Sequence, residues 1–450
     1  MTQNTNNEIY DFIAIGLGPF NLSLACLTDP IDELNGLFLE ARKEFDWHPG
    51  MMLESAHLQT PFMSDLVTLA DPTHPLSFLN YAKLKGKLYS FYIREDFFLM
   101  RAEYNQYCRW AIEQLKSIQF EKRVEDVQWH AEKTCYQVLV NNLKTKQQET
   151  FYTKNLVLGT GPTPWQPECC PENSDNFVHT SQYLYEKKSL QAQKSITVIG
   201  GGQSGAEIYY DLLQDIDRYQ YQLNWVTRSP RFFPLEYTKL TLEMTSPEYV
   251  DYFYDLPQAK KDQLVGQQKN LYKGINSDLI NDIYDLLYVK ELSHQFDTNI
   301  LTNSRLVSVE DSCQSVKLTF EQVEQEQQYQ LHTNKVVLAT GYQYQLPNFL
   351  KNISDHIQWD SLGRFKVARN YTIDSNSRVF VQNAELHTHG FVTPDLGMAC
   401  YRNSHIICSL LGREYYPIEK KIAFQKFDVA SLGTQQPHPA QQPTLQKENS

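Results

Sequence analysis

The sequence predicts an α/β fold with two Rossmann-like nucleotide-binding domains and a small, mainly helical subdomain. A strand, a glycine turn and a helix follow one another twice, at 10–27 and again at 195–213. Two further strands, at 156–161 and 336–342, each end in a turn of small residues and would each complete one domain. The stretch 232–294 is rich in tyrosine and has helical periodicity, so it predicts a helical insert within the second domain.

The 450-residue chain is acidic and of ordinary globular composition, with 41% hydrophobic and 21% charged residues and a net charge of −12. This length predicts two or three packed units. The mixed charges give no basic footprint for nucleic acid or an anionic membrane. The N-terminus does not resemble a secretory signal, and no apolar run approaches the ~20 residues of a membrane helix. Because the eight cysteines form no CxxC pair, we expect a cytoplasmic protein without structural disulfides or a metal site.

The first glycine turn has the spacing of a site for a dinucleotide. Gly16 and Gly18 allow a tight turn and a close approach of the backbone to a pyrophosphate at a helix N-terminus, while Asn21 replaces the usual third small residue. The next strand, 36–39, ends at Glu40. A carboxylate there suits a free ribose hydroxyl, as in FAD. The FAD-binding residues predicted from this motif are Gly16, Gly18, Pro19, Asn21 and Glu40.

The second glycine turn, at 200–205, matches the full G-x-G-x-x-G pattern. Its next strand, 223–226, is followed by Arg228 and no acid. A cation there favours the 2′-phosphate of NADPH over NADH. The alternative is that Arg228 is only a solvated strand end. The predicted NADPH-binding residues are Gly200, Gly202, Gln203, Ser204, Gly205, Arg228 and Ser229.

Two nucleotide sites in one chain imply electron transfer from a nicotinamide to a flavin, without choosing the reaction. The tail is rich in Gln and Pro, and we expect it to be disordered. The predicted division is an FAD-binding domain at 1–165 and 343–432, an NADPH-binding domain at 166–231 and 295–342, a helical subdomain at 232–294 and the tail at 433–450.

From residue 10 to about 411 the chain resembles the flavin-dependent N-hydroxylating monooxygenases of siderophore biosynthesis, the lysine, ornithine and diamine N-hydroxylases. The order of the motifs is more specific than any one of them. The matching segments are GLGPFNLSL at 16–24, WHPGM at 47–51, LQTPFMSDLVTLADPTHPLSFLNYAK at 58–83, Arg101 with Glu103 and Tyr104, GGGQSGAE at 200–207, FFPLEYTK at 232–239, LATGY at 338–342 and His387-x-His389-Gly390.

The resemblance implies roles around the flavin ring. Gln59, Trp47 and Arg101 are the implied catalytic residues, with Arg101 near both the flavin and the nicotinamide. The alternatives are a core aromatic for Trp47, a surface amide for Gln59 and, for Arg101, a salt bridge with Glu103. The residues implied to flank the isoalloxazine are Trp47, His48 and Gln59 on one side and His389 and Gly390 on the other.

The resemblance also implies the reaction. NADPH reduces the flavin, molecular oxygen forms a C4a-hydroperoxyflavin, and one oxygen atom passes to the nitrogen of a small primary amine. An ammonium cannot attack, and a free alkylamine has a pKa of about 10.4, so the site must favour the neutral amine. A homo-oligomer, often a tetramer, is further implied.

The residues around the substrate depart from the amino-acid hydroxylases. The ornithine and lysine enzymes carry a lysine at the position of Ser64, where it grips the substrate carboxylate. Two asparagines for the amino-acid head are replaced by Ser246 and Leu271, and a serine is replaced by Gly397 beside Asp395. We therefore predict a decarboxylated amine such as putrescine, cadaverine or histamine, with Asp395 pairing with the distal cation. The alternative is an L-lysine or L-ornithine N-monooxygenase, with Ser64 a neutral variant and Asp395 a helix cap.

Other classes of flavoprotein remain as rivals. A disulfide reductase needs a cysteine pair beside the flavin, and the adjacent pair Cys169-Cys170 lies in a proline-bounded linker. A Baeyer-Villiger or sulfur monooxygenase has a linker fingerprint that Phe177, His179 and Tyr183 echo faintly. A flavoprotein used only for binding would tolerate damaged glycine turns, and both turns are intact.

Overall fold

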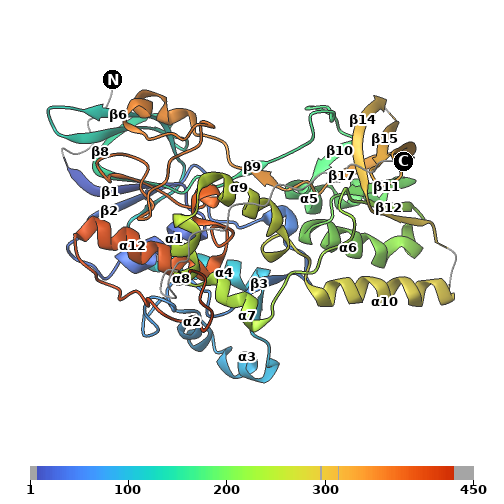
Figure 1. The fold of residues 1–450 in the computed structure, drawn as a ribbon, viewed down its shortest axis with the longest axis horizontal. Coiled ribbons are helices and arrows are strands. Elements are labelled where there is room, and N and C mark those ends of the chain that lie inside the picture. Colours follow the sequence, from blue (N-terminus) through green and yellow to red (C-terminus); the bar gives the residue numbers. More distant parts are fainter. Residues whose placement is uncertain (1–7, 294–295, 313, 430–450) are drawn as a thin grey trace, which may run out of the picture.

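The computed structural model describes residues 8–293, 296–312 and 314–429. The tail predicted at 433–450 to be disordered lies outside the described residues. Two α/β domains lie side by side (Figure 1). Within the described ranges, no helix has both the length and the apolarity to cross a bilayer.

The described part of the first domain contains a seven-stranded sheet in the order β5-β2-β1-β8-β7-β6, with β19 paired to β8. Parallel pairing joins β5, β2, β1, β8 and β19, whereas β6 and β7 form an antiparallel extension. The strands are β1 Ile9–Ile15, β2 Gly36–Leu39, β5 Ile118–Gln119, β6 Lys122–His130, β7 Cys135–Asn142, β8 Gln148–Leu158 and β19 Val379–Val381. The end of β1 is buried on both faces, which explains its continuous apolar sequence.

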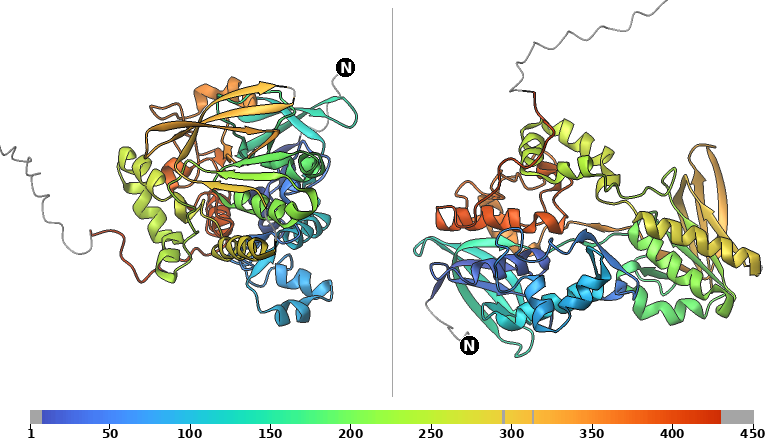
Figure 2. Two further views of the ribbon diagram at one scale, coloured as in Figure 1. Left: turned by 90° about the vertical axis from the view of Figure 1, so that its right-hand side faces the viewer. Right: turned by 90° about the horizontal axis from the view of Figure 1, so that it is seen from below.

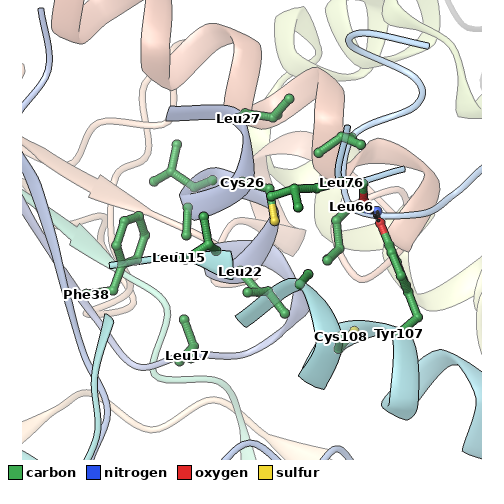
Figure 3. Close-up of a cluster of buried hydrophobic side chains, with 14 of the residues drawn as sticks. Leu17, Leu22, Cys26, Leu27, Phe38, Leu66, Leu76, Tyr107, Cys108 and Leu115 are labelled. Carbon is green, nitrogen blue, oxygen red and sulfur yellow. Dashed lines mark hydrogen bonds between the residues drawn. The ribbon is translucent and has the colours of Figure 1, made fainter. Parts of the chain in front are cut away.

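Helices cover this sheet and form the largest core cluster (Figure 3). Leu22 and Cys26 of α1 face Cys108 and Tyr107 of α4 across it. The Tyr107 hydroxyl donates to the Leu76 carbonyl at 2.7 Å, so this buried ring keeps a hydrogen-bond partner. The elements of this layer are α1 Pro19–Thr28, α2 Phe78–Leu84, α3 Leu88–Arg94, α4 Arg101–Gln114 and α12 Ala399–Leu411, with the antiparallel pair of β3 His57–Pro61 and β4 Phe98–Met100.

The second domain holds, in its described residues, a five-stranded parallel sheet in the order β10-β17-β11-β12-β13 and a three-stranded antiparallel sheet, β14-β15-β16. The strands are β10 Phe177–His179, β11 Ser195–Ile199, β12 Gln222–Val226, β13 Thr298–Leu301, β14 Ser304–Ser312, β15 Ser315–Gln322, β16 Gln327–Thr333 and β17 Lys335–Leu338. Helices α5 Tyr183–Gln191 and α6 Gln203–Tyr219 pack on the larger sheet.

The chain crosses between the domains through a small antiparallel pair formed by β9 and β18. The exchange of domains was predicted near 165 and 343, and these exact boundaries stay a prediction. The connecting elements are β9 Thr163–Pro164, β18 Tyr342–Gln343, α11 Leu386–His389 and the 3-10 turns η1 Pro49–Met51, η2 Thr180–Gln182, η3 Glu243–Thr245, η4 Lys269–Leu271, η5 Asn348–His356 and η6 Leu396–Met398.

The helical insert is shorter than the predicted range of 232–294. Helices α8 (Pro247–Asp255) and α9 (Gln258–Gln267), which follow α7 (Lys239–Leu242), lie against the first domain, where Tyr249 and Phe253 pack on Phe391. The last helix, α10 (Ser277–Ser293), instead packs along α6 of the second domain (Figure 2). Its Ile283 joins the apolar core of that domain, because the buried stripe of α10 complements that of α6.

Candidate functional site

The first glycine turn is shaped by close backbone contacts. Gly16 has a φ of +87°, and a Cβ built on it would lie 2.5 Å from the Gly159 carbonyl oxygen. Gly18 begins α1 without a side-chain cap and faces open space. Glu40 follows β2 and accepts the Leu17 N–H at 2.7 Å. The turn thus leaves room and amide donors for an anion, with a carboxylate beside it, as a dinucleotide such as FAD requires.

Asn21 supports this turn from inside the fold. Its side-chain amide donates to the Gly16 carbonyl at 2.7 Å, and its oxygen accepts from Gln382 at 2.6 Å. A Cβ at Gly159 would lie 2.3 Å from the Asn21 amide nitrogen. Asn21, which replaces the usual small third residue of the motif, therefore fits only because the residue after β8 is a glycine. Pro19 is the first residue of α1 and is also buried. Direct contacts of Asn21 and Pro19 with a cofactor stay predictions.

The second turn repeats this construction. Gly200 has a φ of +138°, and a Cβ there would lie 2.0 Å from the Ala339 carbonyl oxygen. A Cβ on Gly205 would lie 2.3 Å from the Gly200 carbonyl oxygen, so helix and turn touch at this point. Gly202 precedes α6 without a side-chain cap, and Gln203 and Ser204 form its first turn. A second helix N-terminus is thus open to a phosphate group.

A cluster of cations lies beside the second turn. Arg228, in the loop after β12, and Lys269 are close enough to Lys273 to lower its pKa, in addition to the larger effect of burial. The carbonyl of Lys273 is 3.6 Å from a Cβ built on Gly202. Among the described residues, no carboxylate forms an ion pair with any of these three cations. Ser229 lies in the same loop, where its N–H binds Thr227. Unpaired cations at this place suit an anionic ligand group.

Two of the three predicted catalytic residues meet at the boundary between the domains. Arg101, at the start of α4, forms a two-pronged ion pair with Glu207 of α6, at 2.8 and 3.1 Å. Gln203 also donates to Glu207, and Gln59 donates to Gln203 at 3.3 Å. Gln59 is therefore not a free surface amide. The suggested salt bridge of Arg101 with Glu103 is wrong, since the partner comes from the other domain.

The third, Trp47, lies near the same boundary. Its ring is 5.2 Å from Tyr104 and 4.9 Å from His48 between centroids. Burial, followed by the charge of Arg101, lowers the pKa of His48 to about 4, so this imidazole is neutral at pH 7. His389 is fully enclosed, stacks on Tyr371 at 4.5 Å and has its pKa lowered mainly by burial.

Gly390 follows with a φ of +82°, and a Cβ built on it would lie 3.1 Å from the Phe253 ring of the insert. The turn at 389–390 therefore joins the first domain to the insert. Whether His389 and Gly390 flank the flavin stays a prediction.

Ser64 lies close to Asp395 and Gly397, although it is far from them in the sequence. A Cβ on Gly397 would lie 3.2 Å from both an Asp395 carboxylate oxygen and the Ser64 hydroxyl. Asp395 caps η6 by accepting the Gly397 N–H at 2.8 Å, as the alternative interpretation expected. Burial raises the pKa of Asp395. The pKa of the Tyr237 hydroxyl is raised to about 12, mainly by burial and in addition by the nearby charge of Asp395. The same carboxylate can therefore be both a cap and a partner for a cation.

Ser246 and Leu271 occupy different surroundings. Ser246 is fully buried, and its hydroxyl accepts the Tyr249 N–H at the start of α8. Leu271 ends η4 and packs against the apolar cluster of the insert. The Ser246 hydroxyl therefore caps the N-terminus of α8. A contact of Ser246 or Leu271 with the substrate stays a prediction.

The comparison with known proteins agrees with this geometry. A family model described as L-lysine 6-monooxygenase/L-ornithine 5-monooxygenase matches residues 8–344. The chain belongs to this family. A relative named putrescine N-hydroxylase, from Shewanella oneidensis, is 52% identical over 439 residues, which are 98% of this chain and 88% of the relative.

Members of the family with solved structures have the same fold. An FAD-bound cadaverine monooxygenase of the desferrioxamine pathway, from Erwinia amylovora, superposes with a TM-score of 0.93 at 60% identity, covering 94% of this chain and 99% of the other. An ornithine N-hydroxylase from Kutzneria sp. 744, with reduced FAD, NADP⁺ and L-ornithine, has a TM-score of 0.84 at 26% identity, covering 91% and 100%. The resemblance and the fold class inferred from the sequence are confirmed.

Within the family fold, the features of the rival classes have structural roles. Burial, followed by the neighbouring Cys169, raises the pKa of Cys170 to about 12, and a protonated thiol is a poor nucleophile. His179 lies within hydrogen-bond distance of Ser181 and the Gly341 carbonyl, and the Tyr183 hydroxyl binds a carboxylate of α6. Phe177 packs within the second domain. These residues hold the linker to the second domain.

The open face of Gly18 gives a test of the first nucleotide site. We expect Gly18→Ala to weaken FAD binding by about tenfold or more, because the new methyl group enters the space that a pyrophosphate would need. The apo-protein should lose only about 1 kcal/mol of unfolding free energy, the usual scale for such a change at a helix N-terminus. FAD titration of the apo-protein measures the affinity. Gly266→Ala, in equally open space on α9, is the control; equal FAD affinity of both variants would contradict the assignment.

Proposed function

We propose that this chain is an FAD- and NADPH-dependent monooxygenase that hydroxylates one nitrogen of a small diamine for siderophore biosynthesis. The observation that carries the choice of a diamine is the place of Asp395 beside Ser64. A carboxylate there suits an ammonium group and repels the carboxylate of an amino acid. The relatives named putrescine N-hydroxylase and cadaverine monooxygenase support the same class of substrate.

The two glycine turns would hold the two cofactors. FAD would lie with its pyrophosphate at Gly16 and Gly18 and its ribose at Glu40, and NADPH with its pyrophosphate at Gly200 and Gly202. The open helix N-termini at these turns fit both pyrophosphates. When bound, FAD accepts a hydride from NADPH and activates molecular oxygen. The chain itself contributes binding, orientation and exclusion of water.

On the substrate side, Asp395 would bind the distal ammonium and so orient the diamine. Its carboxylate must be ionised for this, and burial raises its pKa. Binding should therefore weaken as the pH falls through that raised pKa. The reacting nitrogen must be neutral, and the apolar surroundings of a closed site favour loss of its proton. A second carboxylate at the reacting end would oppose this loss.

An amine panel tests the proposal. We expect hydroxylamine formation from putrescine or cadaverine, with oxygen uptake coupled to product. Histamine has an imidazole in place of a distal aliphatic ammonium. Slower product formation from histamine than from putrescine or cadaverine would therefore show a preference for aliphatic diamines over other decarboxylated amines. Faster product formation from L-ornithine or L-lysine would instead establish the amino-acid alternative, and consumption of NADPH without any hydroxylated amine would reject N-hydroxylation.

The cations beside the second turn predict the choice of nicotinamide cofactor. We expect Lys273→Ala to raise the KM for NADPH about tenfold or more and to leave that for NADH almost unchanged, because only NADPH carries the 2′-phosphate. Arg228→Ala should act in the same direction. Flavin reduction measured with each nicotinamide gives both values. Lys260→Ala, an exposed cation on α9, is the control; equal losses with NADPH and NADH would contradict the assignment.

We further propose that the protein is cytoplasmic and forms a homo-oligomer, and light scattering during gel filtration tests the oligomeric state. The cysteines that the structure describes are free thiols, which supports a reducing compartment.

Helix α3 projects from the first domain (Figure 1), and its Tyr89, Tyr92 and Ile93 are exposed. Apolar patches of this kind mark association surfaces. Charged substitutions at Tyr92 and Ile93 should shift the mass towards the monomer.

A further inference from the structure

Glu207 is a buried carboxylate that the nucleotide turns do not explain. It lies on the second turn of α6 with a side chain only 5% exposed. It binds Arg101 of the first domain through both oxygens and accepts the amide of Gln203 at 3.0 Å. Gln203 in turn accepts the N–H of Asn276, just before α10, at 2.8 Å. One carboxylate therefore joins α4 in the first domain to α6 and the start of α10.

The surrounding interface is closely packed. Arg101 also donates to the Met51 carbonyl at 2.6 Å, and Met51 packs in the core of the second domain. A Cβ on Gly50 would lie 1.9 Å from the Ser181 carbonyl oxygen, so the backbones of η1 and η2 touch. Arg101 and Glu207 thus form their pair where the two domains meet.

A buried ion pair seldom stabilises a fold more than apolar residues of the same size would. Its more specific effect is geometric, because two parallel hydrogen bonds fix the relative orientation of the two groups. We propose that Glu207 is a positioning residue for hydride transfer. By fixing Arg101 and Gln203 across the domain boundary, it aligns the nicotinamide carried by the second domain with the flavin carried by the first. NADPH loses a hydride to become NADP⁺, and the flavin becomes reduced.

This proposal rests on the FAD and NADPH part of the proposed function and not on the amine. The test is anaerobic flavin reduction by NADPH in a stopped-flow instrument, with no amine present, so an error about the substrate cannot affect it. We expect Glu207→Gln, which keeps the size and removes the charge, to slow reduction at least tenfold, with full FAD content and an unchanged flavin spectrum. Reduction by dithionite should keep its wild-type rate, because it needs no nicotinamide.

A double-mutant cycle separates positioning from general destabilisation. In an Arg101→Gln background, Glu207→Gln should cause a much smaller further loss, because only the part of its effect that passes through Gln203 remains. Glu149→Gln is the matched control, since it breaks a similarly buried pair with Lys122 inside the first sheet. Its reduction rate should stay within twofold of wild type.

Hydrogen exchange of the apo-protein gives a readout that needs no cofactor. Because the Asn276 N–H is held by Gln203, exchange at 274–277 should speed up in Glu207→Gln. Glu207→Asp keeps the charge, is shorter by one methylene group and should show a smaller loss of reduction rate, so it serves if the Gln variant folds poorly. A wild-type reduction rate in Glu207→Gln, or an equal loss in the Arg101→Gln background, would overturn the proposal.

Discussion

Replacing Asp395 with Asn is expected to raise the KM for putrescine or cadaverine more than about tenfold, because it removes a charge-assisted hydrogen bond to the distal ammonium. Asn can still accept the Gly397 N–H, so η6 keeps its cap. Asp395→Ala should raise the KM at least as much. Steady-state hydroxylamine formation with each diamine measures the effect.

A monoamine of the same length distinguishes this charge effect from a general disturbance. Pentylamine lacks the distal ammonium, so its kcat/KM should be nearly the same in wild type and Asp395→Asn. The acid limb of the wild-type profile with the diamine, which the raised pKa of Asp395 predicts, should also disappear. Asp374→Asn removes another buried, backbone-bonded carboxylate of the first domain and is the control. Equal losses for monoamine and diamine, or an unchanged KM, would exclude Asp395 from the site.

The sequence predicted the nucleotide-binding framework well, for physical reasons. Strand β11 was expected at 195–199 and runs from Ser195 to Ile199, because a parallel strand covered on both faces is a continuous apolar run. The turns at Gly16 and Gly200 were predictable because only glycine fits their positive φ and close contacts. The structure brings Ser64 and Asp395 together, and their contact with a substrate stays a prediction.

Contacts between distant segments could not be predicted in this way. The amphipathic pattern of α10 shows that one face is buried but does not say against which domain. Lys273 lies near Arg228 because the chain after α9 folds back over the second glycine turn, where the Lys273 carbonyl is 3.6 Å from a Cβ built on Gly202. The pairing of Arg101 with Glu103 could have been doubted, since residues two apart on a helix do not face each other. Nothing in the sequence singled out Glu207 as the true partner.

Introducing the cation of the amino-acid hydroxylases at Ser64 should produce the second large effect. We expect Ser64→Lys to lower kcat/KM for the diamine about a hundredfold or more. The Ser64 hydroxyl and an Asp395 carboxylate oxygen each lie 3.2 Å from the position of a Cβ on Gly397, so a new ammonium on the longer side chain at position 64 can reach Asp395. It then competes from a tethered position with the distal ammonium of the substrate and also repels it. Product formation over a range of diamine concentrations measures the loss.

Two variants separate the charge from the bulk of the new side chain. Ser64→Met is about as long as lysine but uncharged, and Ser64→Ala only removes the hydroxyl. If charge is decisive, Ser64→Ala stays within about twofold of wild type, Ser64→Met loses much less than Ser64→Lys, and an Asp395→Asn background removes most of the difference between Met and Lys. Equal losses in Ser64→Met and Ser64→Lys would make the effect steric. Full diamine turnover in Ser64→Lys would mean that the distal ammonium of the substrate binds elsewhere. The ammonium of the introduced lysine would occupy Asp395, so that carboxylate could not also bind the substrate.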